Sequence, residues 1–196
     1  MIPALLAAAA AAVATAFEPP SAEDPLPAAL GALGPQPAGV TALTARAGRP
    51  FHGARLDHGV SDAVDVGVGL DVWPEGFYRP TAQARVRAFR SGPAQLTVRG
   101  TLGRVVGASP GLVHTTDGEL ALQLGFAPLA RLGAFAEVSL LGATDFTRAH
   151  TAGFTQVQGG LAFAPRGRLS LLASAGVLQG ARGARAVGSG GAAFRF

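Results

Sequence analysis

The feature that most constrains this chain is a period-two alternation of side chains, which begins near Asp62 and continues to the C-terminus. Apolar residues alternate with small or polar ones, and successive side chains of a β-strand point to opposite faces of the sheet. In the first run, for example, Val64 and Val66 flank Asp65. Eight such runs follow one another, which predicts an all-β chain with one apolar face and one polar face.

The length of the runs and of their connections points to a membrane. The runs are about 10 to 12 residues long, which suits a tilted strand that crosses a bilayer and exceeds the usual length of about 5 to 6 in soluble sheets. Tight turns that contain Gly or Pro, such as 91–94 and 128–131, alternate with longer loops. Only 14% of the residues are charged, against about 25% in a typical soluble domain. We therefore predict a transmembrane up-and-down antiparallel β-barrel over residues 62–196, with eight strands, or ten as the alternative.

The residues before the barrel divide into three parts. Residues 1–16 form a short Ala-rich stretch that ends in small residues, which predicts a signal peptide. The prolines of residues 17–39 cannot continue a helix or donate to a sheet, so we expect a Pro/Ala-rich periplasmic linker there. Residues 40–61 show no clear period over most of their length, and whether they add a strand pair stays open.

Aromatic residues gather at two levels of the predicted barrel, as they do at membrane interfaces. The predicted girdles are Phe126, Phe163, Phe194 and Phe196 at the short-turn ends of the strands, and Trp73, Phe77, Tyr78 and Phe154 at the loop ends. Phe89 and Phe135 fall in the inward register instead. Either a β-bulge or a filled interior would explain each of them.

Charged residues of both signs lie in the inward register. Because an eight-stranded barrel is just wide enough to be filled by side chains, charges buried there persist only when they pair. We expect a structural network of arginines and carboxylates, with an ion pathway as the alternative. The predicted interior network comprises Asp65, Asp71, Arg85, Arg87, Arg99, Glu119, Glu137 and Arg195.

The pattern resembles the small outer-membrane β-barrels of Gram-negative bacteria, of the OmpA/OmpX type. The resemblance covers the signal peptide and residues 62–196, and its most specific element is the C-terminal end, where Ala192, Phe194 and Phe196 alternate. In that family such an end is the signal by which the barrel assembly machinery recognises its clients. The resemblance thus implies the outer membrane as the location, and its lipid and the assembly machinery, through Phe196, as partners.

Composition and spacing argue against several other functions. All 16 cationic residues are arginines and they are scattered along the chain, whereas a nucleic-acid binder clusters them on one face. Without cysteine the chain has neither a disulfide nor a thiol nucleophile. The four histidines fall in segments predicted to be irregular and lack the spacing of metal ligands, so no metal site is expected; they are His52, His58, His114 and His150.

One stretch resembles a catalytic motif. Residues 107–111 match Gly-x-Ser-x-Gly around Ser109, with His114 nearby and Asp117 or Asp145 as candidate orienting acids. That motif needs a strand-to-helix turn, and the residues after it offer no helix. We therefore predict no catalytic site.

The function predicted from the sequence is that of a non-enzymatic, integral outer-membrane β-barrel with a structural or surface-interaction role and no cofactor. Its loops, where an external ligand of unidentified nature would bind, face outside. Three alternatives stay open. The first is a narrow passive pore, which would need ten or more strands. The second is an outer-membrane lipid hydrolase that uses Ser109 and His114, and the third is a secreted, soluble lipid-binding barrel, apolar inside and polar outside.

Overall fold

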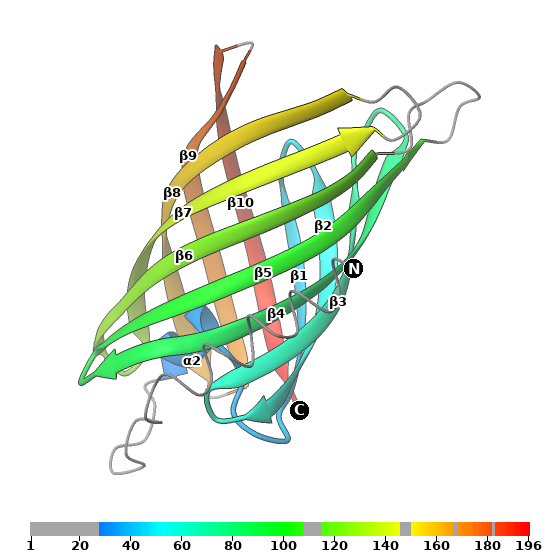
Figure 1. Cartoon of the computed structure of the whole chain (residues 1–196). Helices are drawn as coiled ribbons and strands as arrows, with labels where there is room; N and C mark the ends of the chain where they lie inside the picture. The colour runs from blue at the N-terminus through cyan, green and yellow to red at the C-terminus, as the bar shows by residue number, and fades with distance from the viewer. Residues whose placement is uncertain (1–27, 108–114, 146–149, 167, 182) are drawn as a thin grey trace.

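The structure is a computed structural model that describes residues 28–107, 115–145, 150–166, 168–181 and 183–196. These residues form a closed barrel of ten β-strands and one short helix (Figure 1). Each strand runs antiparallel to the next along the chain, and the last strand pairs with the first. The elements are α2 (Ala28–Leu33), β1 (Thr41–Arg49), β2 (His52–Ser61), β3 (Val64–Val72), β4 (Phe77–Ser91), β5 (Ala94–Gly107), β6 (Thr115–Leu129), β7 (Leu132–Asp145), β8 (His150–Arg166), β9 (Leu169–Gly180) and β10 (Gly183–Arg195).

The predicted count of eight strands is wrong, because the barrel has ten. The extra pair is β1 and β2, which come from residues 40–61. The two faces of β2 differ little in hydrophobicity, since Gly53 and Gly59 point inward and an outward position carries only Ala54. The all-β antiparallel barrel is confirmed, and the eight alternating runs coincide with the strands β3 to β10.

Large apolar side chains cover the outside of the barrel. Leu122 and Leu140, for example, are 46% and 60% exposed, whereas Asp65 and Thr97 on the inner face are almost completely buried. This is the reverse of a soluble barrel, which is apolar inside and polar outside. It is the arrangement of a wall that contacts lipid.

The two phenylalanines of the inward register have different explanations. The pairing of β4 with β5 shifts between Arg87 and Phe89, so a β-bulge turns Phe89 to the outside, where it is 56% exposed. Phe135 does face the interior, beside Gly160, where a Cβ atom would collide with its ring. A bulge and a filled interior therefore both occur, one at each position.

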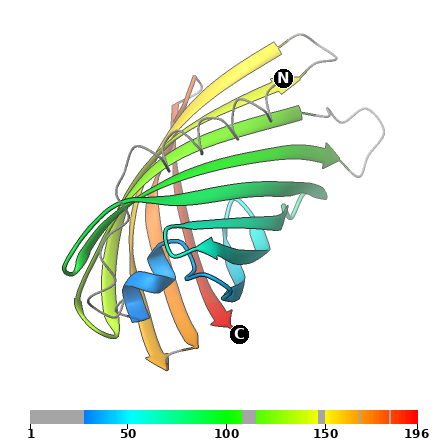
Figure 2. The same cartoon turned by 60° about the horizontal axis from the view of Figure 1, so that its bottom comes forward.

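The two ends of the barrel differ. The C-terminus and the turns between β4 and β5 and between β6 and β7 lie at one end, the short-turn end (Figure 1). The connection between β3 and β4 and the last residues of β5 and β7 lie at the other, the loop end (Figure 1). At the short-turn end α2 lies against β6 to β9, close to the C-terminus (Figure 2), with Ala29 and Leu33 buried. No helix of the described residues is long and apolar enough to cross a membrane.

The N-terminal predictions fall largely on residues that the structure does not describe. The predicted signal peptide, residues 1–16, and the first part of the predicted linker, residues 17–27, lie outside the described residues. The second part, residues 28–39, contains α2 and leads into β1. We call residues 28–37 the plug segment.

Candidate functional site

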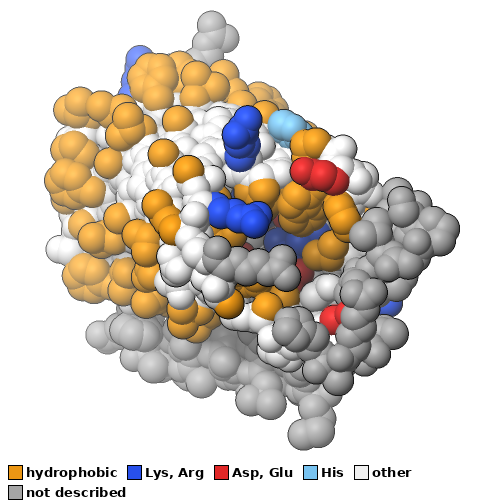
Figure 3. Space-filling view, turned by 90° about the horizontal axis from the view of Figure 1, so that it is seen from above, with side chains coloured by type: hydrophobic (Ala, Val, Ile, Leu, Met, Phe, Trp, Pro, Cys, Tyr) orange, Lys and Arg blue, Asp and Glu red, His pale blue; other side chains and the backbone are white. Residues whose placement is uncertain are grey.

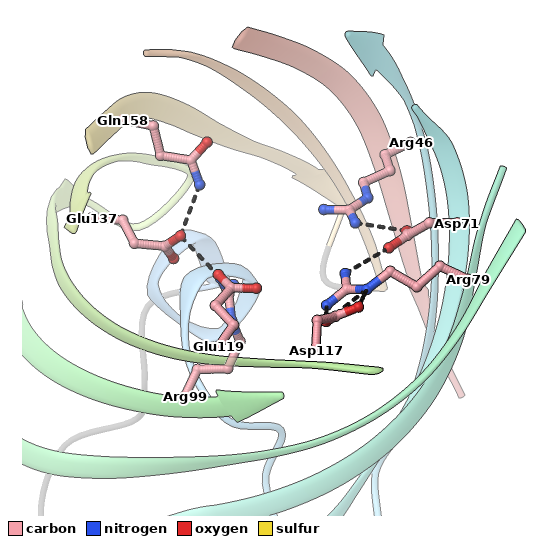
Figure 4. Close-up of polar contacts among 8 residues, drawn as sticks. All are labelled: Arg46, Asp71, Arg79, Arg99, Asp117, Glu119, Glu137 and Gln158. Carbon is pink, nitrogen blue, oxygen red and sulfur yellow. Dashed lines mark hydrogen bonds and ion pairs between the residues drawn. The ribbon is translucent and has the colours of Figure 1, made fainter. Parts of the chain in front are cut away.

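Arginines and carboxylates from several strands form ion pairs inside the barrel near the loop end. Asp71 on β3 pairs with Arg46 on β1 at 2.7 Å and with Arg79 on β4 at 3.2 Å. Arg79 also reaches Asp117 on β6, where its Nε donates to both carboxylate oxygens at 3.0 and 2.9 Å and a terminal nitrogen pairs with the same carboxylate. These four residues, the loop-end cluster, lie on the right of Figure 4.

Glycines on the inner face make room for this cluster. Asp71 is paired in register with Arg79, and Gly103 on β5 is paired with Asp117, so Arg79 crosses β5 to reach its second carboxylate. A Cβ atom on Gly103 would collide with the Arg79 guanidinium, and one on Gly53 would lie 2.5 Å from Oδ1 of Asp71. The ion pairs therefore depend on the missing side chains of these glycines.

A second group, the central cluster, gathers around Arg99 on β5. One terminal nitrogen of Arg99 donates to Glu119 on β6 at 2.7 Å and to Glu137 on β7 at 3.0 Å. Gln158 on β8 donates to Glu137 at 2.8 Å. Two carboxylates thus share one guanidinium, and the amide of Gln158 supplies a further donor, as the left of Figure 4 shows.

A third group, the plug-end cluster, lies between the cavity and the plug segment. Arg85 on β4 pairs with Asp65 on β3 at 2.5 Å and with Asp57 on β2 at 3.3 Å. Gln83 donates to Asp57 at 2.6 Å, and the backbone N–H of Gln36 in the plug segment donates to Asp65 at 2.8 Å. Asp65 therefore joins the wall of the barrel to the plug segment.

Two further arginines of the wall hold the plug segment. Arg87 donates to the carbonyl of Pro35 at 3.4 Å, and Nε of Arg195 donates to Oε1 of Gln36 at 3.1 Å. Gly133 on β7 faces α2, since a Cβ atom there would lie 3.3 Å from two α2 side chains. The wall thus provides hydrogen-bond donors for this segment and a glycine where α2 packs.

A polar cavity of about 200 Å³ remains inside the barrel. Its lining extends from Arg49 and Phe51 at the loop end to Ala32 and Leu33 of the plug segment. Figure 3, which looks in from the loop end, shows charged side chains in a hollow and hydrophobic side chains over the outer wall. Figure 4 shows the loop-end and central clusters on opposite sides of this space. The cavity therefore reaches the loop end and is bounded at the other end by the plug segment.

The structure places all eight predicted interior residues inside the barrel, but it does not join them into one network. Asp65 lies with Arg85, Arg99 with Glu119 and Glu137, and Asp71 with two arginines outside the predicted set. Arg87 and Arg195 contact the plug segment.

Sequence reasoning missed six charged residues of the interior. Three come from the strand pair that was left open, and three come from segments that were expected to be loops. They are Arg46, Arg55, Asp57, Arg79, Asp117 and Asp145. The signal for β2 was the spacing of two between Arg55 and Asp57, with apolar Leu56 between them.

The aromatic residues of the short-turn end lie on the outer face, where all four are exposed: Phe126, Phe163, Phe194 and Phe196. At the loop end Tyr78 is exposed and Phe77 is half-buried. Trp73 packs against Phe51 with 5.0 Å between ring centroids. Phe154 shares the register of the interior glutamines of β8, and a Cβ atom on Gly180 would contact its ring.

The residues of the hydrolase alternative are not brought together among the described residues. Ser109 and His114 lie outside the part of the chain that the structure describes. Asp117, one candidate orienting acid, is bound to Arg79, and Asp145, the other, is buried on β7.

The expectation that the histidines lie in irregular segments is wrong for three of them. His52 and His58 are on β2, both exposed, and His58 contacts the hydroxyl of Thr41 at 2.9 Å. His150 begins β8. Within the described residues no three His, Cys, Asp or Glu side chains are grouped to hold a metal ion.

Comparisons with known proteins give similarity in fold alone. No protein-family model and no curated protein matches the chain. Among solved structures, outer-membrane-expressed OmpT of Vibrio cholerae is 9% identical with a TM-score of 0.45, over 74% of this chain and 56% of OmpT. The NanC porin is 10% identical with a TM-score of 0.44, over 79% of this chain and 98% of NanC. Ail, the attachment invasion locus protein of Yersinia pestis, is 12% identical with a TM-score of 0.28, over 81% of this chain and 99% of Ail. The chain thus spans about half the length of the OmpT structure.

The outer wall and the interior of the barrel both indicate a protein that spans a membrane. The closed sheet leaves no strand edge unpaired, which the hydrocarbon of a bilayer requires. The outer face is apolar and the inner face carries the charges. The chain is therefore an integral membrane β-barrel.

Proposed function

We propose that the protein is a narrow outer-membrane pore for small polar solutes, which its plug segment closes at the short-turn end. The observation that carries this proposal is the polar cavity of about 200 Å³ that reaches the loop end. A cavity lined by charges and amides holds water, whereas a cavity lined by apolar groups stays dry. The interior is therefore a water-filled half-channel.

The strand count supports a pore over a filled barrel. Eight strands leave an interior that side chains fill, and the diameter grows with each added strand. In this barrel the ion pairs lie along the wall, and the loop-end and central clusters leave space between them (Figure 4). A narrow pore would need ten or more strands, and this barrel has ten.

The plug segment determines whether this half-channel conducts. It is bound to Asp65, Arg87 and Arg195 and packs with α2 against β6 to β9. Solutes that enter from the loop end meet Ala32 and Leu33 at the bottom of the cavity. We expect low conductance while the segment is in place and a larger conductance once it is removed.

Planar-bilayer recordings test this proposal. The variant that lacks residues 28–37 should show a single-channel conductance several times that of the intact protein. Heat-modifiable migration on gels serves as the control for a folded barrel. A folded deletion variant whose conductance does not exceed that of the bare bilayer would contradict the pore and favour a structural or surface-interaction role.

A disulfide provides a matched control within one chain. The Cβ of Ala29 lies 3.3 Å from the position of a Cβ on Gly133, close to the span of about 3.5–4.5 Å found in disulfides. Ala29→Cys with Gly133→Cys should therefore lock α2 to β7, and the chain has no other cysteine. The oxidised protein should conduct no more than the intact protein, and reduction should restore the intact level.

The proposal includes no catalytic step and no cofactor. Its partners are the outer-membrane lipid and the barrel assembly machinery, through the C-terminal end. That end supports a relation to the OmpA/OmpX type in assembly, since Phe194 and Phe196 are exposed on the wall with ring centroids 6.4 Å apart. Ten strands exceed the eight of the small OmpA/OmpX-type barrels.

A further inference from the structure

Among the inward-facing arginines that line the cavity, one has no partner in the described part of the chain. Arg55 lies on the inner face of β2 and lines the cavity, and it makes no hydrogen bond or ion pair with another described residue. The carboxylates that line the cavity are already paired with other arginines: Asp57 with Arg85, Asp71 with Arg46 and Arg79, and Glu119 and Glu137 with Arg99. The positive charge of Arg55 is thus left without a direct counter-charge on the described wall.

Further polar groups of the same cavity are also unsatisfied. Nε of Arg99 is buried and has no hydrogen-bond partner. Gln123 and Gln156 line the cavity, and their amides form no hydrogen bond with another described residue. Buried donors without partners are rare and each calls for an explanation such as a bound ion or water.

The charges around Arg55 favour an anion. Arginines outnumber carboxylates in the cavity lining. The lining arginines are Arg46, Arg49, Arg55, Arg79, Arg85 and Arg99, and the lining carboxylates are Asp57, Asp71, Glu119 and Glu137. A guanidinium donates two parallel hydrogen bonds to a carboxylate or phosphate, which gives strong and specific binding.

We propose that the unpaired guanidinium of Arg55 forms a binding site for small carboxylated or phosphorylated solutes inside the barrel. The oxyanion reaches the site from the loop end and accepts hydrogen bonds from the Arg55 guanidinium. This inference rests on the proposed pore for the entry of the solute. The binding itself does not require that the plug segment leave.

Calorimetric titration of the full-length protein in detergent micelles tests the site, with inorganic phosphate and with acetate as probes in a chloride background of constant ionic strength. The intact protein should bind at least one of the two, and the comparison shows which oxyanion geometry the site prefers. Arg55→Gln should weaken that binding by roughly tenfold or more, because a hydrogen bond to a charged group contributes at least about that factor.

Two further variants separate the site from general effects of charge and folding. Arg131→Gln removes the same charge from an exposed position at the short-turn end and should leave binding unchanged. Arg55→Lys keeps the positive charge but replaces the planar guanidinium with an ammonium group, which cannot donate two parallel hydrogen bonds. It should bind the oxyanion more weakly than the intact protein and more tightly than Arg55→Gln. An intact protein that binds neither probe, or equal affinities of the intact protein, Arg55→Gln and Arg55→Lys, would overturn the proposal.

The outcome distinguishes this inference from the proposed pore. A protein that binds phosphate or acetate through Arg55 but does not conduct after removal of residues 28–37 contradicts the pore and leaves the site standing. A protein that conducts after that removal but binds neither oxyanion contradicts the site and leaves the pore standing.

Discussion

Two neighbouring residues of β6 provide the sharpest test of the barrel's inside and outside. Leu122 lies at mid-strand on the outer face, is 46% exposed, and is paired with Val98 on β5 and Val138 on β7, so three apolar side chains lie side by side on the wall. Gln123 points the opposite way, lines the cavity, and is paired with Glu137. The same substitution at these two positions therefore places the same charge in lipid or in the lumen.

We expect Leu122→Arg to destabilise the folded barrel by about 2–4 kcal/mol, the cost of an arginine on the lipid face near the bilayer midplane. This corresponds to roughly a 30- to 700-fold decrease in the folding equilibrium constant. Gln123→Arg enters the polar cavity with Glu137 opposite, so its effect should stay within about 1 kcal/mol.

Urea titration of the protein in lipid vesicles measures both variants against the intact protein. The folded fraction is read from the heat-modifiable gel band, and tryptophan emission serves as a second probe. Equal losses for the two variants would show that the wall is not lipid-facing at Leu122. A larger loss for Gln123→Arg would show that the assignment of the two faces is reversed.

Three further predictions address the interior and the C-terminal end. Asp71→Asn should destabilise the barrel by about 1–3 kcal/mol, because Arg46 loses its partner while Arg79 keeps Asp117, and Glu75→Gln in an exposed connection should have no measurable effect on the urea midpoint. Gly67→Ala should cost about 1–3 kcal/mol, because its Cβ would collide with a paired carboxylate; Gly142→Ala, with open space around it, is the control, and equal midpoints would contradict the role given to the glycine. Deletion of Phe196 removes one apolar side chain, worth about 1.5–3 kcal/mol, so refolding in detergent should be only modestly impaired, whereas surface display in cells should fail; normal display would contradict the C-terminal signal.

The strands β3 to β10 were predictable because apolar residues, large in most of these strands, alternate with polar residues or glycine. That contrast fades in β1 and β2. Their inward positions include Gly48, Gly53 and Gly59, and several outward positions carry alanine, so neither face stands out in a window of the sequence. Closure of the barrel makes these strands possible, because β1 pairs with β10 from the far end of the chain, and no local pattern records that partner.

The ion pairs were predictable as a class but not as partners. Arg79 lies in residues 74–80, which the sequence predicts to be a longer connection between two strands, and Pro80 lacks the N–H that a central strand donates. In the structure neither residue is paired with β5, so the proline costs no ladder hydrogen bond to that strand, while both stay paired with β3. This local release allows the side chain of Arg79 to cross β5 and reach Asp117.

The plug segment was not predictable from composition. Prolines exclude a long helix or a strand, and they led to the expectation of an extended linker over residues 17–39. They are compatible with one helical turn that ends before Pro35, and the residues that bind the segment lie far away in the sequence, as with Gln36 and Arg195. The same residues would form a linker if the barrel did not bind them. The groups that bind them come together only in the closed barrel, so the local sequence does not reveal the plug.

Inward-facing glycines leave room for charged and polar side chains inside this barrel. Some ion pairs between strands that are not neighbours need an inward glycine on the strand between them, and Gly103 is that glycine for Arg79. Gly67 leaves room for the carboxylate of Asp57, and Gly176 on β9 does the same for Gln158. Arg55 also has an inward glycine beside it, Gly69, but its guanidinium makes no ion pair with another described residue. Its hydrogen-bond donors therefore stay available to a solute in the lumen.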